Sequence, residues 1–123
     1  MTCEDIASMI AGIGLPYAYD HFEETEAPGN PPFICFFYPS HDDFIADDTN
    51  YQSIIRLVIE LYTDNIDFTL ESRVESALTG AGLPYTSERE WIESERMYQT
   101  TYNTEVTLQP SPEPGPGDSG TNN

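Results

Sequence analysis

The chain offers two histidines and two cysteines as candidates for nucleophilic or metal chemistry. Neither His21 nor His41 belongs to a catalytic motif, and the sequence contains no Gly-x-Ser-x-Gly elbow, Cys-x-x-Cys pair or phosphate-binding glycine loop. His41 precedes Asp42 and Asp43, which together would form a corner of a metal site. A solvated loop histidine is the simpler interpretation, and it is the one that we favour.

The cysteines do not form a disulfide framework. Cys35 lies in the apolar run FICFFY, which is typical of a buried cysteine acting as a small hydrophobic residue. Cys3 comes at the start of a predicted helix and is expected to be free. Because cytosolic thiols stay reduced, we expect no disulfide between them.

Carboxylates are numerous, but none is singled out for catalysis. The segment DDFIADD lacks the alternating acids, central glycine and terminal glutamate of an EF-hand calcium loop. A catalytic carboxylate needs burial or a specific partner to shift its pKa, and no sequence pattern indicates one. We therefore expect no enzymatic activity, no cofactor and no resident metal ion.

The charge is the unusual feature. The chain of 123 residues has 22 acidic residues, four arginines and no lysine, which gives a formal net charge of -18. Such a surface repels nucleic acid and anionic lipid, because binding phosphates needs a basic footprint. The charge fits high solubility, a basic protein partner, DNA mimicry or a surface past which DNA slides without sticking. No apolar run reaches the roughly 20 residues that span a bilayer, and the N-terminus lacks a basic signal region, so we expect a soluble protein made in the cytoplasm.

Two helices are predicted, at residues 2–13 and 66–81. Thr2 and Asp67 are the expected N-caps, with Glu4 and Asp5 in the first turn of the first helix. Apolar residues recur at helical spacing on one face of each helix: Ile6, Met9, Ile10 and Ile13 in the first, and Leu70, Val74, Ala77, Leu78 and Ala81 in the second. Glu71 and Arg73 are expected to lie outside the apolar face of the second helix.

The phrases GIGLPY (residues 12–17) and GAGLPY (residues 80–85) end the two helices in the same way. In each, glycines stop the helix, a proline prevents its continuation, and an extended segment begins. Either convergent capping chemistry or a duplicated helix-then-strand unit explains the repeat.

Five extended segments are predicted, at residues 16–22, 33–38, 51–63, 88–95 and 97–108. In the third, Ile55, Leu57, Ile59 and Leu61 mark one face, and Ile54, Arg56, Val58, Glu60 and Tyr62 mark the other. The order helix, three strands, helix, two strands predicts an α+β domain of two layers. Its sheet is antiparallel or mixed, and both helices cover one face. Residues 1–109 form this single domain, and residues 110–123, with four prolines and three glycines, form a flexible tail.

Two features suggest contact with a partner. Residues 39–50 form an acidic loop in which apolar side chains stand among aspartates, as at many interfaces. The candidates for an interface or a lumen are Asp42, Asp43, Phe44, Ile45, Asp47 and Asp48. Packing of Phe44 and Ile45 onto the core is the competing interpretation. Trp91 would be a natural hot spot of an interface, but we expect it to pack in the core, under a helix.

The sequence resembles a family of small proteins from long-tailed bacteriophages and prophages. The similarity lies in YDHFEE, PPFIC, the D-x-F-x-A-D-D loop, VIELYTD and WIESE, and it extends over residues 4–107. The family comprises proteins called tail terminators, tail completion proteins or minor tail proteins.

The resemblance implies a structural virion protein at the head-proximal end of the tail. Six copies would form a ring that caps the tail tube, meets the head-closing connector and lets DNA pass through its lumen without specific binding. It implies the tail-tube protein, the connector and further copies of the chain as partners, with no membrane and no cofactor. The alternatives are a head-closure connector or tail-tube subunit, and an acidic DNA mimic that inhibits a host DNA-binding protein.

Overall fold

A computed structural model describes residues 1–22, 29–39 and 53–108 of the chain. Helix α1 (Cys3–Ala11) begins with a capping box: the Asp5 amide donates to Thr2 Oγ1 at 3.1 Å, and the Thr2 amide donates to Asp5 Oδ2 at 2.8 Å. These two bonds satisfy amides that have no partner within the helix. The predicted helix and its cap are confirmed.

Helix α3 (Phe68–Gly80) begins at the predicted cap, where Asp67 Oδ1 accepts a hydrogen bond from the Leu70 amide at 3.0 Å. The second glycine of the repeated phrase has a positive φ in both copies. Gly14 and Gly82 adopt φ values of +91° and +76°, which only glycine adopts without strain. The chain thus leaves both helices through a left-handed glycine, which convergent capping and a duplicated unit both predict.

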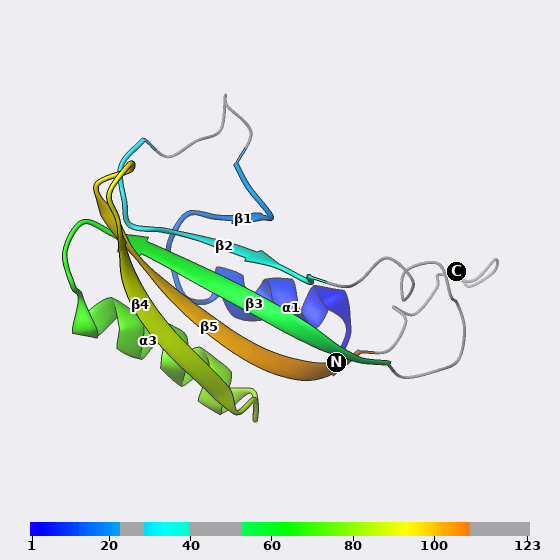
Figure 1. The fold of residues 1–123 in the computed structure, drawn as a ribbon. Helices are drawn as coiled ribbons and strands as arrows, with labels where there is room; N and C mark the ends of the chain where they lie inside the picture. The colour runs from blue at the N-terminus through cyan, green and yellow to red at the C-terminus, as the bar shows by residue number, and fades with distance from the viewer. Residues whose placement is uncertain (23–28, 40–52, 109–123) are drawn as a thin grey trace.

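Five strands form one mixed sheet in the order β1-β2-β3-β5-β4 (Figure 1). Their bounds are β1 Tyr17–Tyr19, β2 Phe33–Phe37, β3 Ser53–Thr63, β4 Tyr85–Ile92 and β5 Met97–Leu108. β1 runs parallel to β2, and the other neighbouring pairs are antiparallel. The predicted α+β class is confirmed.

The core lies between the sheet and the two helices. The predicted inner row of β3 is buried, and it shares one cluster with Ile6 and Ile10 of α1 and Val74 and Leu78 of α3. Because one face of the sheet contacts both helices, the helices cover the same side, as expected (Figure 1). The residues that alternate with the core-facing ones along each strand point to the opposite face of the sheet, away from the helices. We call this face the open face.

Two strands differ from the prediction by more than one residue at their ends. β1 ends at Tyr19 because Asp20 turns the chain at a φ of +69°, whereas the sequence predicts a strand to residue 22. β4 covers residues 85–92 instead of 88–95, because residues 93–96 form the turn to β5. In that turn Arg96 has a φ of +54°, and its amide donates to the Ile92 carbonyl at 2.7 Å. In both places charged residues continue the alternation of polar and apolar residues, so the sequence pattern did not reveal the turns.

Candidate interaction surfaces

The six loop residues that the sequence singled out lie outside the described residues. They are Asp42, Asp43, Phe44, Ile45, Asp47 and Asp48, and His41 also falls in this segment. The Pro/Gly-rich tail at residues 110–123 lies outside as well. The candidate surfaces among the described residues lie in other parts of the chain.

The described histidine and cysteines do not gather into a site. His21 is exposed, and its Nδ1 lies 3.0 Å from Asp20 Oδ2. Both thiols are free, and burial, with the nearby Glu60 and Asp20 carboxylates, raises the pKa of Cys35 to about 11. That thiol is therefore protonated at neutral pH. Within residues 1–22, 29–39 and 53–108, no three His, Cys, Asp or Glu side chains are placed to hold a metal ion.

No helix in the described part of the chain is long and apolar enough to cross a membrane.

A carboxylate lies on the buried face of α3, where the sequence predicted only apolar groups. Glu71 was expected outside this face, but it is almost fully buried and accepts two 2.8 Å hydrogen bonds from Arg89 of β4. Thr100 of β5 donates a third bond to it at 3.1 Å. The bonds from Arg89, and then that from Thr100, outweigh burial and lower the pKa of Glu71. The prediction missed this because its partners lie on strands distant in the sequence.

Trp91 is exposed rather than buried, which corrects the expectation of a core position. It lies on the edge strand β4 and remains 40% exposed, with its ring 4.9 Å from that of Tyr98. Its Nε1 donates to Glu93 at 2.8 Å, and the Arg96 guanidinium lies 6.0 Å from its ring. Phe68, 70% exposed at the start of α3, is approached by Arg89 at 5.5 Å.

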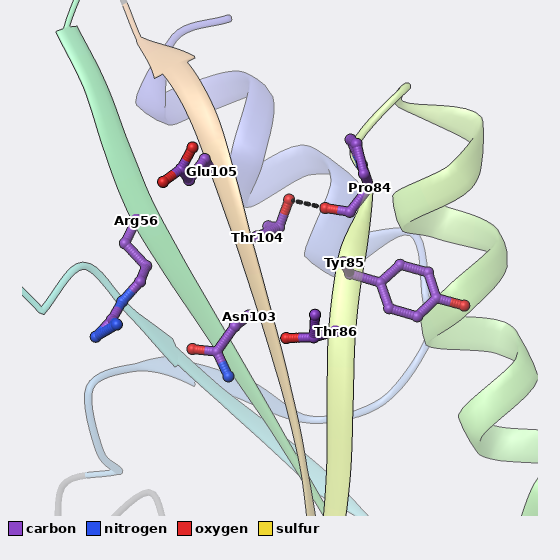
Figure 2. A pocket seen from close by; sticks show the side chains of 7 residues that line it. All are labelled: Arg56, Pro84, Tyr85, Thr86, Asn103, Thr104 and Glu105. Atoms are coloured by element: carbon purple, nitrogen blue, oxygen red, sulfur yellow. Dashed lines mark hydrogen bonds between the residues drawn. The ribbon is translucent and has the colours of Figure 1, made fainter.

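An arginine lies on the open face of the sheet, beside a pocket between β3, β4 and β5 (Figure 2). The pocket has a volume of about 450 Å³, and its lining residues are Arg56, Pro84, Tyr85, Thr86, Asn103, Thr104 and Glu105. Figure 2 shows the polar ends of Arg56, Thr86 and Asn103 on one side of the sheet, whereas Tyr85 points toward α3. The Thr104 hydroxyl already has a hydrogen-bond partner, since it donates to the Pro84 carbonyl at 2.6 Å.

Sequence reasoning placed Arg56 on the outward row of its strand but assigned it no role. The sequence did contain a signal that pointed to Arg56. A two-layer fold leaves this row of the strand uncovered, and the chain has only four arginines and no lysine. The pocket itself was not predictable. Thr86 and Asn103 face one another only through the register of β4 against β5, which local patterns do not specify.

No family model matches the chain, and none of the curated proteins compared with it matches either. The resemblance to tail terminators therefore stays a prediction at the level of the family. Among solved structures, the chain is similar to one from the "virion of native gene transfer agent (GTA) particle". The two share 16% sequence identity with a TM-score of 0.50, over 84% of this chain and 85% of that one. At this identity the similarity is one of fold.

Proposed function

We propose that the protein is a structural component of a phage-like virion, a tail terminator or tail completion protein. In this role, copies of the chain form a ring that ends the tail tube and joins it to the head connector. The protein is located in the virion, at the head-proximal end of the tail. We propose no catalytic step and no cofactor.

The observation that supports this proposal most is the fold shared with a virion chain. The similarity covers 84% of this chain and 85% of the virion chain. The motifs YDHFEE, PPFIC and WIESE independently resemble those of tail terminators. Fold similarity alone supports a virion part, and these motifs favour the terminator among virion parts.

The charge is consistent with a ring around DNA. A ring needs contacts between two different surfaces of the chain, arranged so that the rotation closes. A lumen lined by carboxylates would repel the phosphate backbone and let DNA slide, since charges interact appreciably within about 8 Å at physiological salt. We propose that the aspartates of the 42–48 segment line the lumen or meet a partner, with Phe44 and Ile45 as apolar contacts. A solved ring with these side chains on its outer wall would contradict that assignment.

A head-closure connector and a tail-tube subunit are the nearest alternatives, since both belong to the same assembly. A tube subunit would polymerise alone into long filaments, whereas a terminator alone would form a closed ring or remain a monomer. An acidic DNA mimic would instead bind a host DNA-binding protein in a salt-sensitive way. The virion-like fold favours the first group over the mimic.

Light scattering of the protein, alone and mixed with the tail-tube protein encoded near it, tests the proposal. We expect the mixture to stop growing in mass when the protein is added, because the capped end accepts no further subunit. The protein alone should have the mass of a monomer or a small closed ring. Unchanged tube growth with a monomeric protein would reject the terminator role in favour of the connector. Filaments formed by the protein alone would identify a tube subunit.

A further inference from the structure

We infer that Arg56 and its pocket receive a carboxylate from a second copy of this chain. The inference rests on the proposed function, because it assumes that copies assemble. It assigns one half of the contact between neighbours to the open face of the sheet, around Arg56, Thr86 and Asn103. The other half is an aspartate or glutamate of the adjoining copy.

Three of the four arginines are already engaged within the chain. Arg89 pairs with Glu71, Arg96 lies 3.4 Å from Glu93, and Arg73 donates to the Ile13 carbonyl. Arg56 is exposed and makes no ion pair or hydrogen bond within residues 1–22, 29–39 and 53–108. Among the described residues it is thus the arginine that remains for a contact between molecules.

The surroundings of Arg56 fit a carboxylate. A guanidinium presents a planar fork of donors that matches the two oxygens of a carboxylate. The Asn103 amide and Thr86 hydroxyl lie on the same side of the sheet and add polar groups to the pocket (Figure 2). Glu105 is the register partner of Arg56, yet the two side chains form no ion pair in the described part of the chain.

The net charge favours another copy as the source of that carboxylate. Two chains of charge -18 repel each other, and a contact that brings a cation of one against an anion of the other offsets part of this repulsion. Each copy carries 22 acidic residues, but Arg56 is the one arginine without a partner among the described residues. In a ring, every copy would give one carboxylate and receive one, so that each Arg56 is neutralised.

The absence of lysine allows a direct test. In Arg56→Lys the new amine belongs to the only lysine of the chain, and a zero-length carbodiimide reagent joins amines to carboxylates in contact with them. We mix isotopically light and heavy copies, allow assembly with the tube protein, cross-link, and identify the joined peptides by mass spectrometry. Arg96→Lys is the matched control, since it places the same single amine at an arginine that already has a partner, Glu93. The N-terminal amine reacts equally in both variants.

We expect the amine introduced at position 56 to be joined to an acidic residue of another copy, as light-heavy peptide pairs. The amine introduced at position 96 should be joined to Glu93 of its own chain. Cross-links from position 56 to Glu105 of its own chain alone, to the tube protein alone, or to nothing would each overturn the inference. As a second measurement, Arg56→Glu should weaken ring formation by about tenfold or more, while Arg96→Glu leaves it nearly unchanged.

The two proposals fail in different ways. If the wild-type protein forms no ring with the tube protein, that result rejects the proposed function itself. If wild-type rings form and Arg56→Glu rings form equally well, only the role of Arg56 is rejected. A cross-link from position 56 to the open face of the other copy, for example to Glu88, would indicate a two-fold dimer. That outcome supports the carboxylate contact and contradicts the ring.

Discussion

Arg89 of strand β4 holds Glu71 of helix α3 through two parallel hydrogen bonds, each 2.8 Å long. Thr100 of β5 donates to the same carboxylate, and Tyr102 of β5 donates to Glu75 one turn further along the helix at 3.1 Å. The helix is thereby joined to both strands at one end of the sheet. Among the described strands β4 lies at one edge of the sheet and pairs with β5 alone, so these bonds hold an edge strand in place.

Replacing the buried carboxylate should destabilise the fold. Glu71→Gln keeps the shape but removes the charge, so Arg89 loses its bidentate partner, and we expect the free energy of unfolding to fall by about 1–3 kcal/mol. Urea denaturation followed by circular dichroism measures this. Glu93→Gln is the control, because its pair with Arg96 is exposed, and it should change stability by no more than about 0.5 kcal/mol. Equal effects of the two substitutions would show that the Glu71 network contributes little.

The same carboxylate should make stability depend on pH in a defined direction. The pKa of Glu71 is lowered in the folded protein, so its ionised form stabilises the fold above the ordinary carboxyl pKa of about 4.3. That contribution is lost as the pH falls from this value through the folded pKa. The difference in unfolding free energy between wild type and Glu71→Gln should therefore shrink between about pH 5 and pH 3. A difference that stays constant over this range would contradict the assignment.

The two left-handed glycines should differ in their tolerance of alanine. A Cβ at Gly14 would lie 2.7 Å from Arg73 Nη2, whereas a Cβ at Gly82 would meet no atom within 4 Å. Both substitutions introduce the strain of a positive φ, about 1–2 kcal/mol, but only Gly14→Ala also displaces Arg73 from the Ile13 carbonyl. Thermal unfolding should show a lower midpoint for Gly14→Ala than for Gly82→Ala. Equal midpoints would mean that Arg73 moves aside without cost, and a lower midpoint for Gly82→Ala would contradict the prediction.

The two thiols should react at different rates. Cys35 is buried and its pKa is raised to about 11, so its reactive thiolate is scarce at pH 8. Cys3 is only half-buried. A chromogenic disulfide reagent should modify about one thiol per native chain quickly, and both after unfolding in urea. Cys3→Ser should abolish the fast phase, and a fast phase that survives this change would place Cys35 nearer the surface.

Local signals predicted the helices and the inner row of β3 because their causes lie within a few residues. Thr2 with Asp5, Asp67 with Leu70, and the glycines of the repeated phrase are contacts of this kind. The burial of Glu71, the exposure of Trp91 and the pocket beside Arg56 depend on strand order and register, which bring together distant parts of the chain. A single sequence carries no local mark of these pairings, so both the buried carboxylate and the exposed tryptophan were misplaced.

Electron microscopy of tail tubes assembled with and without the protein tests the central claim most directly. If the protein is a terminator, tubes grown in its presence should be short, and one end of each should carry a ring of its copies. Tubes of unchanged length, with the protein left free in solution, would contradict the account.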